Sequence, residues 1–152
     1  MNAVAPAQHS AEERERRVAA RMIRQHVLCG EVPLNLHFVM DQTVLERVIG
    51  EPSVMRGQLQ KLLDTAASPN TTLQVLPLNA GGSPGLEGPF SLLTLPEPIP
   101  DFGYAEGQAG MFYIEDREHV RRCTLRFGIL TELALSRADS VNLIAERMSS
   151  FE

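Results

Sequence analysis

The chain has 152 residues, and 14 Lys and Arg against 19 Asp and Glu leave a formal net charge of −5. This length is typical of one domain that buries a core without disulfides or a structural metal. With 43% hydrophobic and 22% charged residues, a wholly disordered chain is excluded. No apolar run reaches the roughly 18 residues that span a bilayer, and the N-terminus lacks the basic and then apolar segments of a signal peptide. We therefore expect a cytoplasmic protein without membrane contact.

The cysteines and histidines show no metal-binding pattern. Cys29 and Cys123 are too far apart in sequence to form a zinc or redox motif, so we expect free thiols. None of the four histidines has a His, Cys or carboxylate at a ligand spacing. They are His9, His26, His37 and His119. We therefore predict no metal and no cofactor.

The N-terminal quarter predicts a tail, a helix and a strand. Residues 1–9 lack periodicity and are predicted to be flexible. Ser10 followed by Glu13 is a capping box, which predicts a helix from about 11 to 28. From 34 to 40 apolar residues recur at every second position, which predicts a strand with one buried face. That face comprises Leu34, Leu36, Phe38 and Met40, whereas Asn35, His37 and Val39 lie on the other.

The middle of the chain predicts two helices and then a set of strands. Asp41 is placed to cap a short helix, and Pro52 begins a second that runs to about Ala67. Strands are predicted over 71–76, 90–95, 101–106 and 111–114. The turns that join the last three contain Gly and Pro and are short, which favours hairpins and hence antiparallel pairing.

The C-terminal third predicts two further helices. Asp116 precedes a long segment whose apolar residues recur at every third or fourth position, so it is the expected cap of a helix. Ser136 with Asp139 begins the last helix. The whole pattern predicts an α+β fold, with a small, mostly antiparallel sheet of about four to five strands packed with about four to five helices. We expect residues 10–152 to form this single domain.

The segment 79–89 is a loop rich in Gly and Pro. It is not a phosphate-binding loop, because no Gly-Lys-Ser/Thr follows, Pro84 and Pro89 remove N–H donors, and a strand comes next. It is either a plain connector or a structured loop that covers a pocket or joins two subunits. In the second case Gly85 and Phe90 are candidates to contact a ligand.

A second candidate site lies at the predicted ends of two strands. Glu106 ends the strand of Tyr104, and Tyr113 with Glu115 ends the next, so two carboxylates and two phenols are expected at one sheet end. Glu106, His37 and Tyr104 are the catalytic candidates, while Tyr113 and Glu115 are candidates for ligand binding. The alternative is that the carboxylates are solvated and that His37 is a hydrogen-bonded spectator, and the residues alone leave both open.

Direct nucleic-acid binding by this chain is not predicted. The first helix carries five Arg and three Glu, but their signs alternate as on a solvated face. No short helix beside it completes a helix-turn-helix, and the chain as a whole is acidic.

From about Glu13 to Ser149 the chain resembles a domain of unknown function that follows an Xre-type helix-turn-helix in many actinobacterial transcriptional regulators. The matching segments are Arg17-Val18-Ala19-Ala20-Arg21, Arg24-Gln25, Met40-Asp41, Leu45, Arg47-Val48-Ile49-Gly50, Val54-Met55-Arg56-Gly57-Gln58-Leu59, Leu62-Leu63, Val75-Leu76-Pro77, Gly85-Leu86-Glu87-Gly88-Pro89-Phe90, Tyr104-Ala105-Glu106-Gly107, Tyr113-Ile114-Glu115-Asp116, Ala134-Leu135-Ser136 and Ser140.

The resemblance implies a regulatory effector domain, usually dimeric, that binds a small molecule or a partner regulator protein. Two departures stand out: Gln42 replaces the usual acidic residue after Asp41, and the DNA-binding module is not in this sequence. The leading hypothesis is a ligand- or protein-binding domain without its own DNA-binding module, and a homodimer. The alternative is a small cofactor-independent cyclase or isomerase of a natural-product pathway, which would use an enclosed pocket with acid-base residues.

Overall fold

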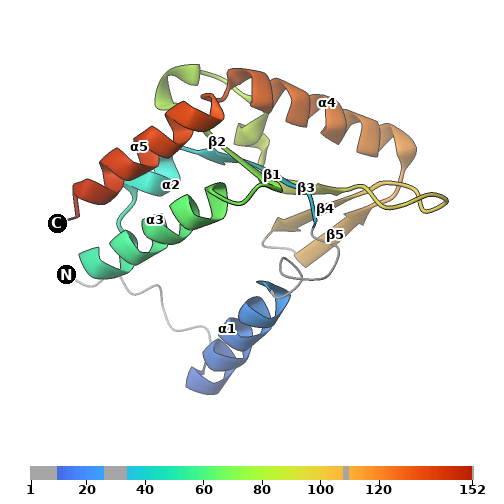
Figure 1. Cartoon of the computed structure of the whole chain (residues 1–152). Helices are drawn as coiled ribbons and strands as arrows, with labels where there is room; N and C mark the ends of the chain where they lie inside the picture. Colours follow the sequence, from blue (N-terminus) through green and yellow to red (C-terminus); the bar gives the residue numbers. More distant parts are fainter. Residues whose placement is uncertain (1–9, 26–33, 108–109, 152) are drawn as a thin grey trace. The chain divides into compact units, whose positions relative to one another are not determined.

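The computed structural model describes residues 10–25, 34–107 and 110–151, except the side chain of Arg24 (Figure 1). The elements in chain order are α1 (Ala11–Gln25), β1 (Leu36–Asp41), α2 (Thr43–Glu46), α3 (Pro52–Ala66), β2 (Thr71–Leu76), the 3-10 helices η2 (Leu78–Ala80) and η3 (Pro84–Glu87), β3 (Phe90–Leu93), β4 (Phe102–Gly107), β5 (Gly110–Ile114), α4 (Arg117–Leu133) and α5 (Arg137–Ser149). The predicted α+β fold and its order of helices and strands are confirmed.

Residues 1–36 form one compact unit and residues 37–152 another, and each is considered by itself. In the first unit, α1 begins as predicted, because the Ser10 hydroxyl accepts a hydrogen bond of 3.1 Å from the Glu13 N–H. Its apolar residues Val18, Met22 and Ile23 are more than half exposed. The predicted tail, the predicted end of this helix and Cys29 lie outside the described residues. That one domain spans 10–152 stays a prediction.

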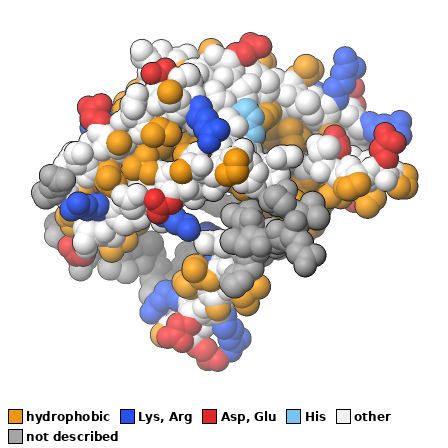
Figure 2. Space-filling view, in the orientation of Figure 1, with side chains coloured by type: hydrophobic (Ala, Val, Ile, Leu, Met, Phe, Trp, Pro, Cys, Tyr) orange, Lys and Arg blue, Asp and Glu red, His pale blue; other side chains and the backbone are white. Residues whose placement is uncertain are grey.

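The core of the second unit lies between α3, α5 and β2. The buried cluster takes Leu45 from α2, residues of α3 and β2, and Ile144 from α5, and it includes Leu59, Ala66, Leu73 and Val75. Figure 1 shows α3 and α5 side by side, and on the face shown in Figure 2 hydrophobic side chains gather over these two helices. The predicted stripe of α3 is confirmed, since Met55, Leu59 and Ala66 are buried. Each fully buried aliphatic side chain contributes about 1.5–3 kcal/mol.

Val75, in the middle of this core, is held through its backbone. The Ser140 hydroxyl accepts a hydrogen bond of 2.9 Å from the Val75 N–H and donates one of 2.8 Å to the Ser136 carbonyl. The Leu135 N–H donates to the Val75 carbonyl at 2.9 Å. Ser136 is also the cap of α5, as predicted, and accepts from the Asp139 N–H at 3.1 Å. These bonds fix β2 to the connection between α4 and α5.

The strands form two sheets, β1-β2 and β3-β4-β5, instead of the single sheet we expected. The break follows β2, where Pro77, η2, η3 and Pro89 occupy the chain up to β3 and leave no extended backbone to continue the first sheet. The pairing predicted for the last three strands is confirmed as antiparallel, with Tyr104 opposite Tyr113 and Gly103 opposite Ile114. A Cβ on the buried Gly103 would lie 3.1 Å from the Ile114 Cβ, so a side chain here would require Ile114 to shift by a few tenths of an ångström.

The predicted strand 34–40 exists, but its predicted buried face does not. Leu34 and Phe38 are 46% and 42% exposed, whereas Val39 and Met40 are both half-buried. The alternation is lost because, of the described residues of β1, only Met40 packs against the core cluster.

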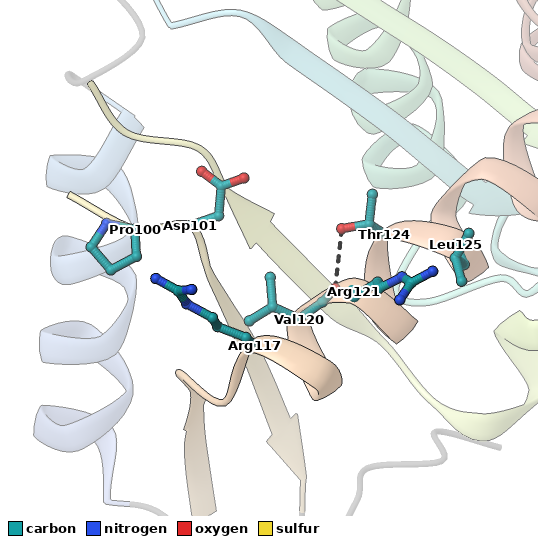
Figure 3. A pocket seen from close by; sticks show the side chains of 7 residues that line it. All are labelled: Pro100, Asp101, Arg117, Val120, Arg121, Thr124 and Leu125. Carbon is teal, nitrogen blue, oxygen red and sulfur yellow. Dashed lines mark hydrogen bonds between the residues drawn. The ribbon is translucent and has the colours of Figure 1, made fainter. Parts of the chain in front are cut away.

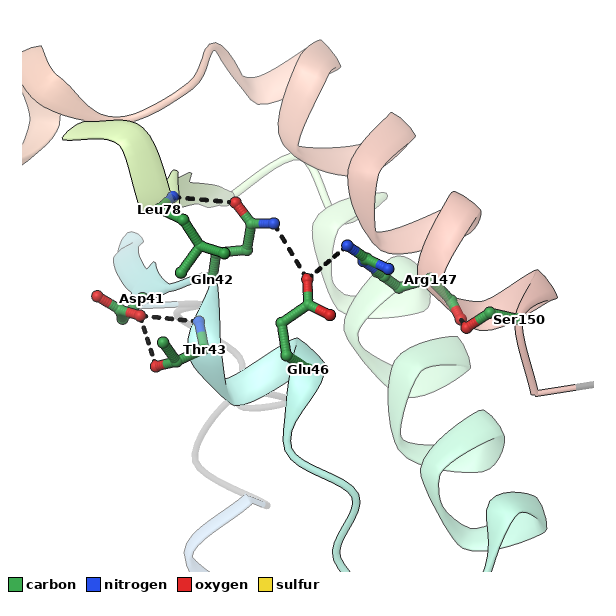
Figure 4. Close-up of polar contacts among 7 residues, drawn as sticks. All are labelled: Asp41, Gln42, Thr43, Glu46, Leu78, Arg147 and Ser150. Atoms are coloured by element: carbon green, nitrogen blue, oxygen red, sulfur yellow. Dashed lines mark hydrogen bonds and ion pairs between the residues drawn. The ribbon is translucent and has the colours of Figure 1, made fainter.

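Gln42 connects α2 with two other elements (Figure 4). Its side-chain oxygen accepts from the Leu78 N–H at 3.1 Å, and its Nε2 donates to the Glu46 carboxylate at 3.1 Å. Glu46 in turn pairs with Arg147 of α5 at 2.7 Å. An acidic side chain at position 42 could accept the first bond, but it has no hydrogen to donate to Glu46. The predicted cap Asp41 accepts from the Thr43 N–H at 2.8 Å, but it lies one residue before the N-cap of α2, which is Gln42.

Replacing Ser140 with Ala should lower the free energy of unfolding by about 1–3 kcal/mol, because the buried Val75 N–H loses its acceptor. Ser149 is the matched control, since its exposed hydroxyl bonds only to the Ala145 carbonyl of its own helix, and Ser149→Ala should cost less than about 0.5 kcal/mol. Urea unfolding of the three proteins, followed by circular dichroism, measures both values. Equal stabilities of the two variants would contradict this role of Ser140.

Candidate functional site

His37 is bound to its neighbours as a structural residue. Its Nε2 lies 2.6 Å from the Gln74 Oε1, and its ring meets the edge of Phe127 at a centroid distance of 5.0 Å. The Gln74 Nε2 donates to the Leu135 carbonyl at 2.9 Å, so the Gln74 oxygen is the acceptor and the His37 Nε2 carries the proton. The side chain joins β1 to β2 and to α4.

The predicted meeting of two carboxylates and two phenols is correct only for the phenols. Tyr104 and Tyr113 lie opposite each other in β4 and β5, with ring centroids 5.7 Å apart. Glu106 is opposite Met111 near the turn, whereas Glu115 follows the far end of β5 beyond Ile114. The prediction for Glu106 and Glu115 is wrong because consecutive strands of a hairpin are antiparallel, so they end at opposite edges.

Gly85 belongs to the loop 79–89 and Phe90 to the strand that follows it, and both elements pack on α4. Gly85 is in η3, and a Cβ there would lie 3.5 Å from the Leu130 side chain. Glu87 forms an ion pair of 2.5 Å with Arg126 of α4. Phe90 is half-buried in β3, opposite Ala105. The segment 79–89 contains the end of η2 and the whole of η3, and η3 packs on α4, whereas its covering of a pocket or joining of two subunits stays a prediction.

Tyr113 and Glu115 line a groove along one side of α4. The groove has a volume of about 560 Å³, and its other lining residues are Ile114, Asp116, His119, Arg122, Cys123 and Arg126. It brings together two of the predicted ligand-binding residues with two arginines that the sequence analysis did not select. Arg122 and Arg126 are four residues apart on a predicted helix, and this spacing is the sequence feature from which the pair could have been selected.

Asp116 fixes the start of this groove and of α4. Its carboxylate accepts from the His119 N–H at 3.0 Å and lies 2.7 Å from the His119 Nδ1. The hydrogen bond from the backbone N–H, followed by the one from the ring, holds the pKa of Asp116 below its ordinary value. The predicted cap is confirmed.

A second groove runs along the other side of α4 (Figure 3). It has a volume of about 380 Å³. Pro100 and Asp101 form one wall, and the helix contributes Arg117, Val120, Arg121, Thr124 and Leu125. The Thr124 hydroxyl donates to the Val120 carbonyl at 3.1 Å and is therefore satisfied within the helix. Each groove thus has a pair of α4 arginines four residues apart.

Between these grooves and the end of the helix, α4 exposes a row of aliphatic side chains. Leu125, Ile129 and Leu133 follow one another at every fourth residue and are 60%, 46% and 38% exposed. The opposite side of the helix is buried through Val120, Cys123 and Leu130. We call these three exposed residues the α4 stripe. The sequence analysis predicted the buried side and did not select the stripe.

Two classes of site are absent within the described ranges. No group of three or more His, Cys, Asp or Glu there could hold a metal ion. Among the helices of those ranges, none is long and apolar enough to cross a membrane.

The carboxyl of Asp116 should titrate below about 3.9, the ordinary value of an aspartate. Because its pKa is lowered in the folded state, its capping bond contributes stability above the unfolded pKa and loses that contribution as pH falls through the folded pKa. Carboxyl chemical shifts measured by NMR between about pH 6 and 2 test this. Asp116→Ala should speed amide exchange in the first turn of α4, whereas Asp101→Ala should not; equal exchange in both would contradict the cap.

The comparisons with known proteins assign a family. The family model described as Domain of unknown function (DUF5753) matches residues 1–146. No curated protein and no solved structure matches the chain. The match includes both grooves, the α4 stripe and most of α5. The chain belongs to the DUF5753 family, a domain of unknown function.

Proposed function

We propose that this chain is a regulatory binding domain that holds a partner protein on α4 and catalyses no reaction. The observation that carries the proposal is the α4 stripe, an apolar row on an outer helix face that begins at Leu125, beside the two arginine-lined grooves. A contiguous exposed apolar surface with a polar rim is typical of a protein interaction site. The resemblance to effector domains of Xre-type actinobacterial regulators supports a regulator as the partner.

The spacing of the stripe fits one kind of partner surface. Leu125, Ile129 and Leu133 cover two turns of helix, about 12 Å in length, which matches an amphipathic helix lying along α4. Arginines at the rim supply hydrogen bonds and ion pairs, and arginine is enriched in protein interfaces. Arg121 and Arg122 stand on opposite sides of the stripe, each in its own groove.

The arrangement of the predicted acid-base residues favours binding over catalysis. A cyclase or isomerase site of the kind considered above needs Glu106, His37 and Tyr104 around one substrate. His37 belongs to the sheet β1-β2 and bonds to Gln74, whereas Tyr104 and Glu106 belong to the sheet β3-β4-β5. Among the residues that line the grooves on α4, Asp116 and Thr124 bond within the helix, and Arg126 pairs with Glu87 of η3.

A regulator with a helix-turn-helix encoded beside this gene is the first partner to test. Calorimetric titration of the purified regulator should give binding to the wild-type domain, and Ile129→Asp should weaken it at least about tenfold, because a charge replaces a buried aliphatic contact. Val54→Asp is the matched control, since Val54 is 58% exposed on α3 and should leave affinity within about threefold. Equal affinity of the two variants, or no binding by any such regulator, would contradict the proposal.

The domain alone should not bind DNA. Its net charge is −5, and the α4 arginines stand beside Asp101, Glu115, Asp116 and Glu118, so no continuous basic surface faces a phosphate backbone. Electrophoretic mobility of duplex DNA from the promoter upstream of the gene should be unchanged by the domain at physiological salt. A shift that disappears when Arg121 and Arg122 are changed to Gln would show that α4 binds nucleic acid instead.

A further inference from the structure

The strand β5 lies at the outer edge of the sheet β3-β4-β5. Its inner side pairs with β4 over residues 110–114, and no strand in the described part of the chain pairs with its outer side. Alternate N–H and C=O groups on that outer side therefore lack a partner strand, and such an edge is a template for another strand.

Nothing in β5 discourages such pairing. Its sequence is Gly110, Met111, Phe112, Tyr113 and Ile114, without a charged residue or a proline. The other outer strand, β3, has only four residues and lies between Pro89 and Pro96. Prolines and charges are the usual protection of sheet edges against association. The edge at β3 is protected in this way, and the edge at β5 is not.

The exposed side chains of β5 lie on both faces of the sheet. Met111, Phe112 and Tyr113 are 60%, 53% and 68% exposed, and successive residues of a strand point to opposite faces. A helix packed on the sheet would cover only one of these faces. A strand added beside β5 covers part of both, because its own side chains also alternate.

We propose that β5 pairs antiparallel with β5 of a second copy of this chain, about a two-fold axis at Phe112. This register pairs all five residues of the strand and places Phe112 opposite Phe112 of the second copy. Met111 then lies opposite Tyr113 of the second copy, a favourable contact of a thioether with an aromatic ring. No charged residue lies on β5, so the two-fold brings no like charges face to face.

The area of this contact predicts a dimer in equilibrium with monomer. Three half-exposed side chains from each copy amount to on the order of 600 Å² of apolar surface, below the 1,200–2,000 Å² of stable complexes. The backbone hydrogen bonds between the strands add specificity of register. This pairing uses the sheet edge and not α4, so it does not depend on the proposed function.

Opposite charges at position 112 provide a test of the register. Only a two-fold at Phe112 places this residue opposite itself, so Phe112→Lys and Phe112→Glu should each raise the dimer dissociation constant at least about tenfold. An equimolar mixture of the two variants should recover the dimer, because Lys then faces Glu. Leu93→Lys is the matched control on the protected edge, where Leu93 is 38% exposed, and it should leave dimerisation unchanged.

Sedimentation velocity from about 1 to 500 µM measures the assembly of each protein, and circular dichroism confirms that each variant is folded. Dimerisation of the wild type, loss in both single variants and recovery in the mixture would support the pairing. A monomeric wild type over this whole range, dimers that persist in the Lys and Glu variants, or no recovery in their mixture would each overturn it.

Discussion

Val75 lies in the middle of β2 with no exposed surface, and its backbone N–H and C=O must find partners inside the protein. One partner is the hydroxyl of Ser140, itself fully buried, and the other is the N–H of Leu135. Leu135 belongs to the short connection between α4 and α5, and Ser140 to the first turns of α5. The requirement to satisfy the backbone N–H and C=O of one buried residue therefore constrains where both C-terminal helices lie relative to the core.

The position of α4 follows from this constraint and determines the candidate surface. Gln74, the neighbour of Val75, donates to the Leu135 carbonyl at the end of α4 and accepts from His37 of β1. At its other end, α4 begins at Arg117 after its cap Asp116, two residues beyond the end of β5. With both ends fixed, the helix buries Val120, Cys123 and Leu130 and exposes the α4 stripe. The proposed binding surface is thus a consequence of how the helix is anchored.

The candidate sites were predicted from sequence to different extents, and the reason is geometric. Caps depend on residues three or four apart, so Ser10, Asp116 and Ser136 were identified from the sequence. The meeting of Glu106 and Glu115 depended on which ends of two strands coincide, and the hairpin separates them. His37 looked available in the sequence because its partner Gln74 is 37 residues away. Nothing in the sequence marked that pair.

The amino-acid sequence by itself determined the local structure of this protein: the order of helices and strands, their caps, the antiparallel hairpins and the apolar residues of α3. These features depend on periodicity and on short-range hydrogen bonds, which are encoded within a few residues. Only the tertiary structure decided that the strands divide into two sheets, that α4 has an exposed apolar side as well as a buried one, and that β5 is an open edge. Each of these depends on which distant segments cover which surfaces, because burial is a property of the assembled chain and not of any one segment.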